Sequence, residues 1–161
     1  MRRTHSDIVS LHEVIANSHI EIKGFYRFNF SEITSNLRSG VEAPVLLLES
    51  HSSELESLTK MVSNFNSRNI SFLLLDFGGK QGDFDRQNEV LDSLENIALD
   101  IISYLVNENK NRSSWMFGMF DINSVKIEKV GPILDNMFGW NILYVLKSHE
   151  SMEINPIKWT M

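Results

Sequence analysis

The sequence contains no cysteine, only three prolines and no long apolar run. Without cysteine the chain has no disulfides and no thiolate-ligated metal sites, which fits an intracellular origin. The longest apolar runs, at 45–48 and 72–75, are too short to span a bilayer, so we expect no membrane association. Two arginines at 2–3 precede no apolar segment of the kind that a signal peptide requires, so none is expected.

Positive charge is scarce in the middle of the chain. The formal net charge is −6, but residues 41–109 alone carry four basic and twelve acidic groups, a balance of −8. Proteins that grip a phosphate backbone do so with clustered lysines and arginines. We therefore expect this acidic middle region to repel nucleic acid.

The apolar content is sufficient for a folded core. Hydrophobic residues make up 42% of the 161 residues, with ten Phe and three Trp, so extensive disorder is not expected. The length favours one domain. We predict a single domain over residues 1–147, followed by a C-terminal tail or edge strand over residues 148–161.

Hydrophobic periodicity predicts the elements of the first half. Thr4 and Asp7 have the spacing of a capping box at the start of the first helix. The expected order is helix 7–18, strand 24–30, short helix 31–37, and strands 44–50 and 69–77. The segment 52–68 has helical spacing of its apolar residues but ends in turn residues. Both a short helix and a long hairpin arm stay open for it.

The second half begins with the most regular element of the sequence. An apolar stripe runs from Val90 to Val106 with polar residues opposite, which predicts one amphipathic helix of about five turns. Strands are expected at 114–121, 124–130 and 140–147. The predicted fold is α+β, with a mostly antiparallel sheet packed against the N-terminal helix and the long amphipathic helix.

The stretch LLLDFGGKQGDFD at 73–85 contains an Asp-Phe-Gly and a Gly-Gly-Lys, which suggest a nucleotide site. The other kinase motifs are absent, and Gly-Gly-Lys lacks both the Walker spacing and a following Ser or Thr. The glycines instead allow the backbone to turn. We interpret the stretch as a strand-to-helix junction in which Asp83 or Asp85 caps the long helix.

The acidic residues of this junction give an alternative interpretation. Asp76, Asp83, Asp85 and Glu89, with Glu49 and Lys80 nearby, have the side chains of a magnesium site in a small metal-dependent hydrolase or binding domain. Helix caps and solvated helix faces collect acids as well. The preferred prediction therefore assigns no metal ligand and no cofactor.

The five histidines give no catalytic pattern. His5, His12 and His19 lie seven residues apart, roughly 10 Å along a helix, which is too far to share one metal ion. They are predicted to form a partly buried or interfacial stripe. His51 and His149 lack a nucleophile partner pattern. No catalytic residue is predicted, and the chain is not expected to be an enzyme.

The order of elements resembles that of tail terminator, or tail completion, proteins and related neck proteins of long-tailed phages and prophages of Bacteroides-like hosts. The resemblance covers residues 4–147 and rests on a series of stretches in one order: FYRFNF, EAPVLLLES, ISFLLLDF, GDFDRQNEVLDSLENIALDIISYL, FDINSVKIEKV and NMFGWNILYVLK. A longer segment at 52–68 and the tail beyond the last strand depart from that pattern.

The resemblance implies a structural virion protein that forms a ring, usually hexameric. Such a ring caps the tail tube, joins it to the head connector and is assembled in the cytoplasm of the bacterial host. DNA would pass through it without specific binding, past an acidic lumen. Glu54, Glu56 and Lys60 are candidates for a lumen or inter-subunit arm. Trp159 and Met161 are candidates for an inter-subunit tail contact, with a disordered tail as the alternative.

Overall fold

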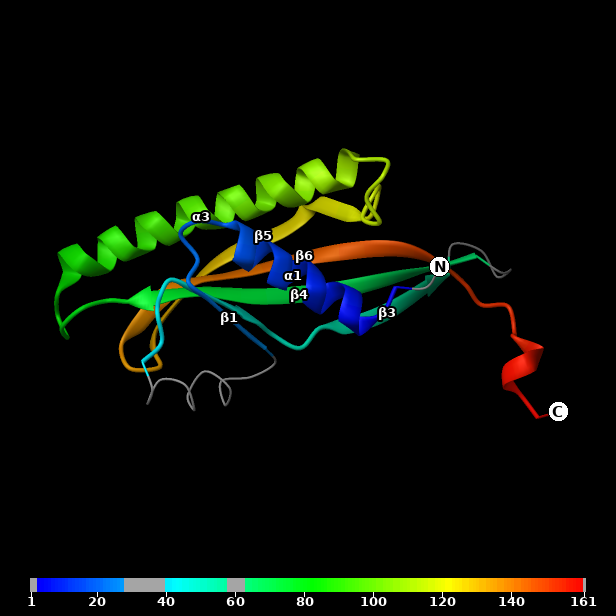
Figure 1. Cartoon of the computed structure of the whole chain (residues 1–161), viewed down its shortest axis with the longest axis horizontal. Coiled ribbons are helices and arrows are strands. Elements are labelled where there is room, and N and C mark those ends of the chain that lie inside the picture. Colours follow the sequence, from blue (N-terminus) through cyan, green and yellow to red (C-terminus); the bar gives the residue numbers. More distant parts are fainter. Residues whose placement is uncertain (1–2, 28–39, 58–62, 161) are drawn as a thin grey trace.

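The computed structural model describes residues 3–27, 40–57 and 63–160, and it has an α+β fold. Within these residues, two helices pack on one face of a six-stranded, mostly antiparallel sheet (Figure 1). The strand order is β1-β2-β4-β6-β5, and β3 pairs with the other part of β4. The strand bounds are β1 Gly24–Arg27, β2 Val45–Leu48, β3 Ser52–Ser57, β4 Ser63–Phe77, β5 Phe120–Ile133 and β6 Met137–Ser151.

The first helix, α1 (His5–Ser18), begins as the sequence predicts. The Thr4 hydroxyl accepts from the Asp7 amide, and the Asp7 carboxylate accepts from the Thr4 amide at 2.7 Å. This capping box satisfies two amides that have no partner inside the helix. Residues 28–30 of the first predicted strand and the short helix predicted at 31–37 lie outside the described residues.

Two extended strands form the middle of the sheet. β4 and β6 have 15 residues each and pair along their whole length, from Ser63↔Ser151 to Phe77↔Met137. The segment 52–57, left open between helix and hairpin, is strand β3 and pairs with β4. The helical alternative is therefore wrong for residues 52–57, because the backbone hydrogen bonds there go to a neighbouring strand.

The long helix, α3 (Phe84–Lys110), has 27 residues and exceeds the five turns expected. Its apolar stripe is buried against the sheet, as predicted. The Asp83 carboxylate caps it by accepting from the Arg86 amide at 3.1 Å. The residues of α3 that lie before and after the predicted stripe, 84–89 and 107–110, are mostly polar, so hydrophobic periodicity did not indicate that they are helical.

The strand predicted at 114–121 is wrong for residues 114–119. These residues form turns after α3, with the Gly118 amide donating to the Asn109 carbonyl and Gly118 at a φ of +70°. Met116 packs into the core from this turn, and Trp115 packs against it partly buried, so these apolar residues are accommodated without a strand. The strand predicted at 124–130 is part of β5, whose pairing with β6 is interrupted between Asp121 and Lys126.

Both faces of the sheet carry apolar residues. The larger cluster lies between the helices and the sheet, and a smaller one on the opposite face comprises Val45, Leu47, Leu73, Leu75 and Met137. The central strands are apolar on both faces for this reason. The last strand continues to Ser151, so the projecting tail begins at Met152. Within its described residues, 152–160, the one element is a short 3-10 turn, η1 (Pro156–Lys158).

Candidate functional site

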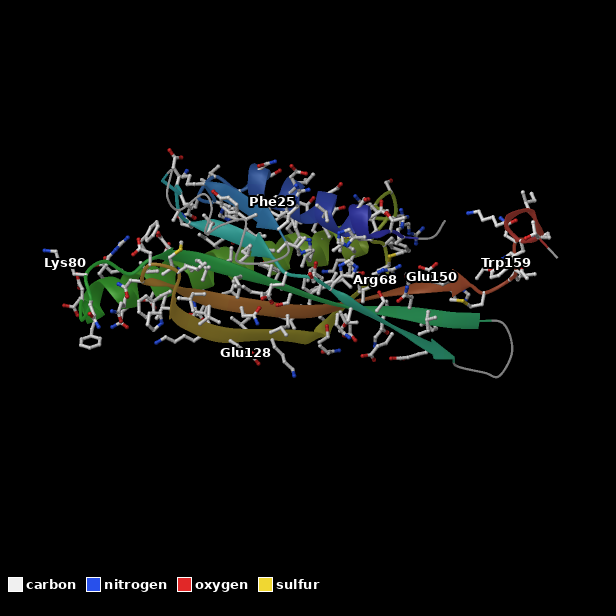
Figure 2. The ribbon with its side chains drawn as sticks, turned by 90° about the horizontal axis from the view of Figure 1, so that it is seen from below. Phe25, Arg68, Lys80, Glu128, Glu150 and Trp159 are labelled. Carbon is white, nitrogen blue, oxygen red and sulfur yellow. The ribbon has the colours of Figure 1, made fainter. Side chains whose placement is uncertain are left out.

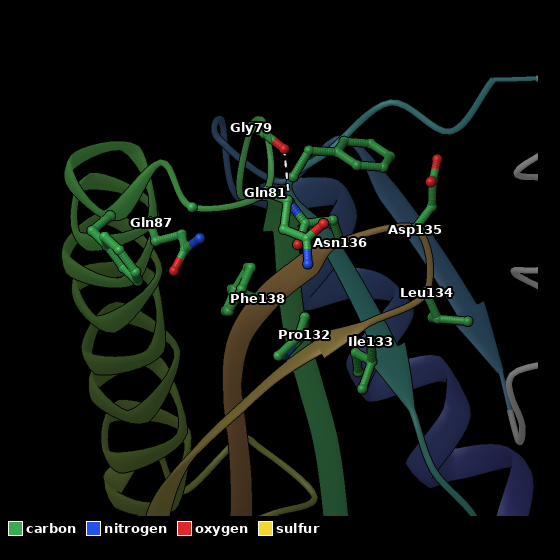
Figure 3. A pocket seen from close by; sticks show the side chains of 12 residues that line it. Gly79, Gln81, Gln87, Pro132, Ile133, Leu134, Asp135, Asn136 and Phe138 are labelled. Carbon is green, nitrogen blue, oxygen red and sulfur yellow. Dashed lines mark hydrogen bonds between the residues drawn. The ribbon is translucent and has the colours of Figure 1, made fainter.

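A groove of about 990 Å³ opens at one end of the sheet. It lies between the turn that joins β4 to α3 and the tight β5–β6 hairpin (Figure 3). The described lining residues are Phe77, Gly79, Gln81, Gly82, Phe84, Gln87, Pro132, Ile133, Leu134, Asp135, Asn136 and Phe138. Its volume is more than twice that of three other pockets lined by described residues, which have about 400, 340 and 200 Å³.

An unusual backbone conformation shapes the hairpin side of the groove. Leu134, Asp135 and Asn136 have φ values of +43°, +54° and +65°, three successive residues in the left-handed region. Asp and Asn tolerate this region, whereas it is strained for leucine. The conformation turns the chain sharply and exposes Asp135 at the rim.

Two hydrogen bonds hold the two walls of the groove together. The Gly78 amide donates to the Asn136 carbonyl at 3.0 Å, and Asn136 Nδ2 donates to the Gly79 carbonyl at 2.7 Å. A side chain at Gly78 would collide with the Phe138 ring, 2.5 Å from the position of its Cβ. Gly78, the first glycine of the Asp-Phe-Gly-Gly stretch, therefore lets the hairpin approach the strand end closely.

The chemistry of the groove suits binding more than catalysis. Among the described residues that line it, Asp135 is the one ionisable side chain, and most of the others are apolar, glycine or carboxamide. Phe84 is 72% exposed at its edge. Such a lining accommodates apolar side chains and offers amide groups for hydrogen bonds to a peptide.

The acids of the alternative metal site do not form a metal-binding group. Asp76 accepts from the Phe77 amide at 2.7 Å, and Asp83 caps α3. Asp76 and Glu89 line one shallow pocket together with Arg86. Glu49 accepts from the Ser71 hydroxyl at 2.6 Å. Among the described residues, no group of three or more His, Asp or Glu side chains is placed to hold a metal ion.

Five of the twelve acidic groups of the middle region lie on the outer side of α3. That side is exposed and carries five carboxylates: Asp85, Glu89, Asp92, Glu95 and Asp100. Arg86 pairs with Glu89 at 3.4 Å, and His19 lies 3.5 Å from Asp100. The opposite side of the same helix is buried, so the helix separates an acidic surface from the core.

Two of the predicted arm residues, Glu54 and Glu56, lie in strand β3. Glu54 accepts from Asn69 Nδ2 at 3.4 Å and Glu56 from the Ser67 hydroxyl at 3.5 Å, and both glutamates are exposed. Lys60 and Met161 lie outside the described residues. Asp85 is an exposed first-turn acid of α3 and, unlike Asp83, is not its cap.

The predicted histidine stripe has three different environments. His12 is fully buried, and its Nδ1 donates to the Ile8 carbonyl at 2.7 Å, so its Nε2 accepts from the Tyr144 hydroxyl at 3.0 Å. Burial lowers the pKa of His12 to about 4 and raises that of Tyr144. His5 stacks on His51 with ring centroids 5.1 Å apart.

A buried ion pair lies toward the other end of the sheet, near the N-terminus (Figure 2). The Arg68 guanidinium lies 3.1 Å from the Glu150 carboxylate, and both side chains are less than a tenth exposed. Arg68 also donates to the Ser148 hydroxyl at 2.6 Å and to the Arg3 carbonyl at 2.8 Å. This network fixes the N-terminus and the end of β6 to β4.

The C-terminal segment projects away from the sheet beyond this network (Figure 1). Its apolar side chains are exposed, Ile157 at 93% and Trp159 at 63%.

Neither the groove nor the ion pair was predicted from the sequence. The Asp-Asn pair at 135–136 was an available signal for the hairpin, whereas Arg68 and Glu150 are 82 residues apart and have no local signal.

No protein-family model matches the chain, and no curated protein matches it either. Among the described residues, no helix is both long and apolar enough to cross a bilayer.

Proposed function

We propose that this chain is a structural subunit of the neck or tail end of a long-tailed phage. Copies of it form a ring, which we expect to be hexameric, that caps the tail tube and joins it to the head connector. The proposal combines the order of elements in the sequence with two surfaces of the folded chain.

The observation that carries the proposal is the projecting C-terminal segment. A solvent-exposed Trp and Ile in a segment with almost no packing of its own are unfavourable in an isolated chain. Aromatic residues of this kind are typical anchors of protein–protein contacts. The segment thus supports a chain that completes its packing in an assembly.

The acidic side of α3 supports a passage for DNA. Five exposed carboxylates on one helix side, with few bases between them, repel phosphates. We assign this side to the lumen of the ring, together with Glu54 and Glu56 of the β3–β4 hairpin. DNA would slide along such a surface without being held.

The test is the mass and shape of the purified chain, by light scattering and negative-stain microscopy. Rings of about six copies with a central hole are the expected result. Identical subunits joined by one repeated contact form a closed ring when the rotation from one subunit to the next adds up to a full turn. A chain that stays at 18.5 kDa at every concentration and on every tail tube offered would contradict the proposal.

A second candidate is a small metal-dependent hydrolase or binding domain. The observation in its favour is the shallow pocket that Asp76 and Glu89 share with Arg86 and Lys23. Calorimetric titration with Mg²⁺ or Mn²⁺ tests it, with Asp76→Ala as the matched variant. Binding that disappears in Asp76→Ala, in a chain that stays monomeric, would favour this candidate over the ring.

A further inference from the structure

We propose that the C-terminal segment 152–160 of one copy occupies the end groove of the next copy, so that subunits join head to tail. The inference rests on the proposed ring and specifies its contact. It assigns the groove an occupant and the exposed tail a binding surface.

The groove and the tail lie at opposite ends of the molecule. Figure 2 shows Lys80, in the turn that borders the groove, at one end and Trp159 at the other. β6 connects the two ends, since Phe138 near its start lines the groove and Ser151 at its end leads into the tail.

The tail is too short to fill the groove of its own chain. Thirteen residue steps of β6 separate Phe138 from Ser151, and at about 3.3 Å per step they span roughly 43 Å. Trp159 is eight residues beyond Ser151 and reaches at most about 29 Å from it. An occupant with this sequence must therefore come from a second copy.

The chemistry of the two surfaces is complementary. Met152 and Ile154 alternate with polar residues and share one side of an extended chain. Ile157 and Trp159 have the same spacing of two and share the opposite side, so an extended tail presents two apolar pairs, and the pair that contains Trp159 is the one assigned to the groove. The groove is apolar at Pro132, Ile133 and Phe138, and its volume of about 990 Å³ accommodates such side chains.

Charge and polar groups are sparse on both surfaces. Asp135 is the ionisable residue among the described lining residues, and the tail carries Lys158, beside Trp159, and Glu153. The carboxamides of Gln81 and Gln87 at the rim supply hydrogen-bond donors and acceptors for the backbone of an extended peptide.

A contact between two different surfaces repeats from copy to copy. Such a heterologous contact closes into a ring when the rotation between neighbours closes, and otherwise gives a filament. Every copy in a ring then gives one tail and receives one. A ring built in this way has no free groove.

Disulfide cross-linking between copies tests the inference directly, because the natural chain has no cysteine. One sample carries Gln81→Cys in the groove and a second carries Thr160→Cys in the tail. Mixing the two under mild oxidation is expected to give a cross-linked dimer that neither sample gives alone. The control mixture pairs Thr160→Cys with Glu13→Cys, an exposed position on α1 outside the groove.

Light scattering of tail variants supplies an independent measure. Trp159→Ala is expected to weaken assembly at least about 30-fold, the effect of removing an interface hot spot. Ile157→Ser is expected to weaken it as well. Ile20→Ser removes an equally exposed isoleucine that lies outside both surfaces, and it is expected to leave assembly unchanged.

The outcomes separate this inference from the proposed function. A selective Gln81–Thr160 cross-link together with loss of assembly on deleting 152–161 supports both. Rings that survive the deletion, or that give no selective cross-link, overturn the head-to-tail contact and leave the ring standing. A cross-link that forms within single copies of a doubly substituted chain also overturns it. A chain that neither assembles nor cross-links contradicts the contact and the ring together.

Discussion

The two ends of the sheet are organised by different physical means. At the groove end, glycines allow backbones and rings to approach closely, and the hairpin is held by two hydrogen bonds to the strand end. At the other end, a buried Arg68–Glu150 pair and the nearby His12–Tyr144 pair satisfy polar groups inside the fold. The groove end is thus shaped by close steric fit and keeps an exposed surface, whereas the end with the Arg68–Glu150 pair is held together by buried polar contacts.

The largest effect is expected from a side chain at Gly139, beside the groove. A Cβ there would lie 1.7 Å from the Leu74 carbonyl oxygen of the paired strand, and this clash is with backbone, so no side-chain rotation relieves it. Gly139→Ala is expected to lower the free energy of unfolding by roughly 4 kcal/mol or more, or to prevent folding. Urea unfolding measures it. Gly118→Ala, with no atom within 4 Å of the added Cβ, is the control and should lose only about 1 kcal/mol through its positive φ.

The next largest effect is expected from removing the buried ion pair at the other end of the sheet. Arg68→Met leaves the Glu150 carboxylate buried without its partner, which is expected to cost about 3–5 kcal/mol in urea unfolding. The double variant Arg68→Met with Glu150→Leu should recover most of that loss, because two apolar side chains replace the pair. A double variant as unstable as the single one would show that the loss comes from packing and not from the unpaired charge.

A pH effect of similar size is expected from His12. Because the folded state lowers its pKa to about 4 from an ordinary value of 6.5, the unfolded chain binds a proton between these values that the folded chain does not. Stability should therefore fall as the pH is lowered from 6.5 to 4, by up to about 3 kcal/mol from this group. Thermal unfolding across this range measures it.

The control for this pH effect is His12→Gln, which does not titrate. Burial also lowers the pKa of His51, so His51 too contributes a loss of stability as the pH falls. The variant should keep only the part that comes from His51 and from other groups. An unchanged pH dependence in His12→Gln would contradict the assignment.

The smallest effect belongs to the start of α3. Asp83→Ala removes the cap and is expected to cost about 1 kcal/mol without changing assembly. Asp85→Ala removes an equally exposed acid two residues on that makes no cap, so its loss should be smaller. Loss of a Mg²⁺-dependent activity in Asp83→Ala would instead favour the metal-dependent alternative.

Local patterns predicted much of this architecture. The Thr4–Asp7 capping box, the central strand ending at Phe77, the long helix and the Asp83 cap all follow from residues close in sequence. The turn at 114–119 was misread as a strand because its apolar residues at 115–117 are typical of strands. The β3 strand could not be separated from a helix, since pairing with β4 decides it and periodicity does not.

The candidate site was less accessible to sequence reasoning. The groove needs the turn at 78–83 and the hairpin at 131–137 to meet, and they are about fifty residues apart in the chain. The exposed Trp159 was predicted as a contact residue from its position in a polar tail. Its distance from the groove of its own chain follows only from the length of β6, which the sequence underestimated at both ends.

The full-length pairing of β4 with β6 has a mechanical consequence. The tail continues directly from β6, so a force on the tail pulls this strand along its own axis, between β4 on one side and β5 on the other. Hydrogen bonds between antiparallel strands run across that axis, so many of them bear the load at once and do not open one after another. The chain is thus built to transmit tension from one end to the other without unravelling.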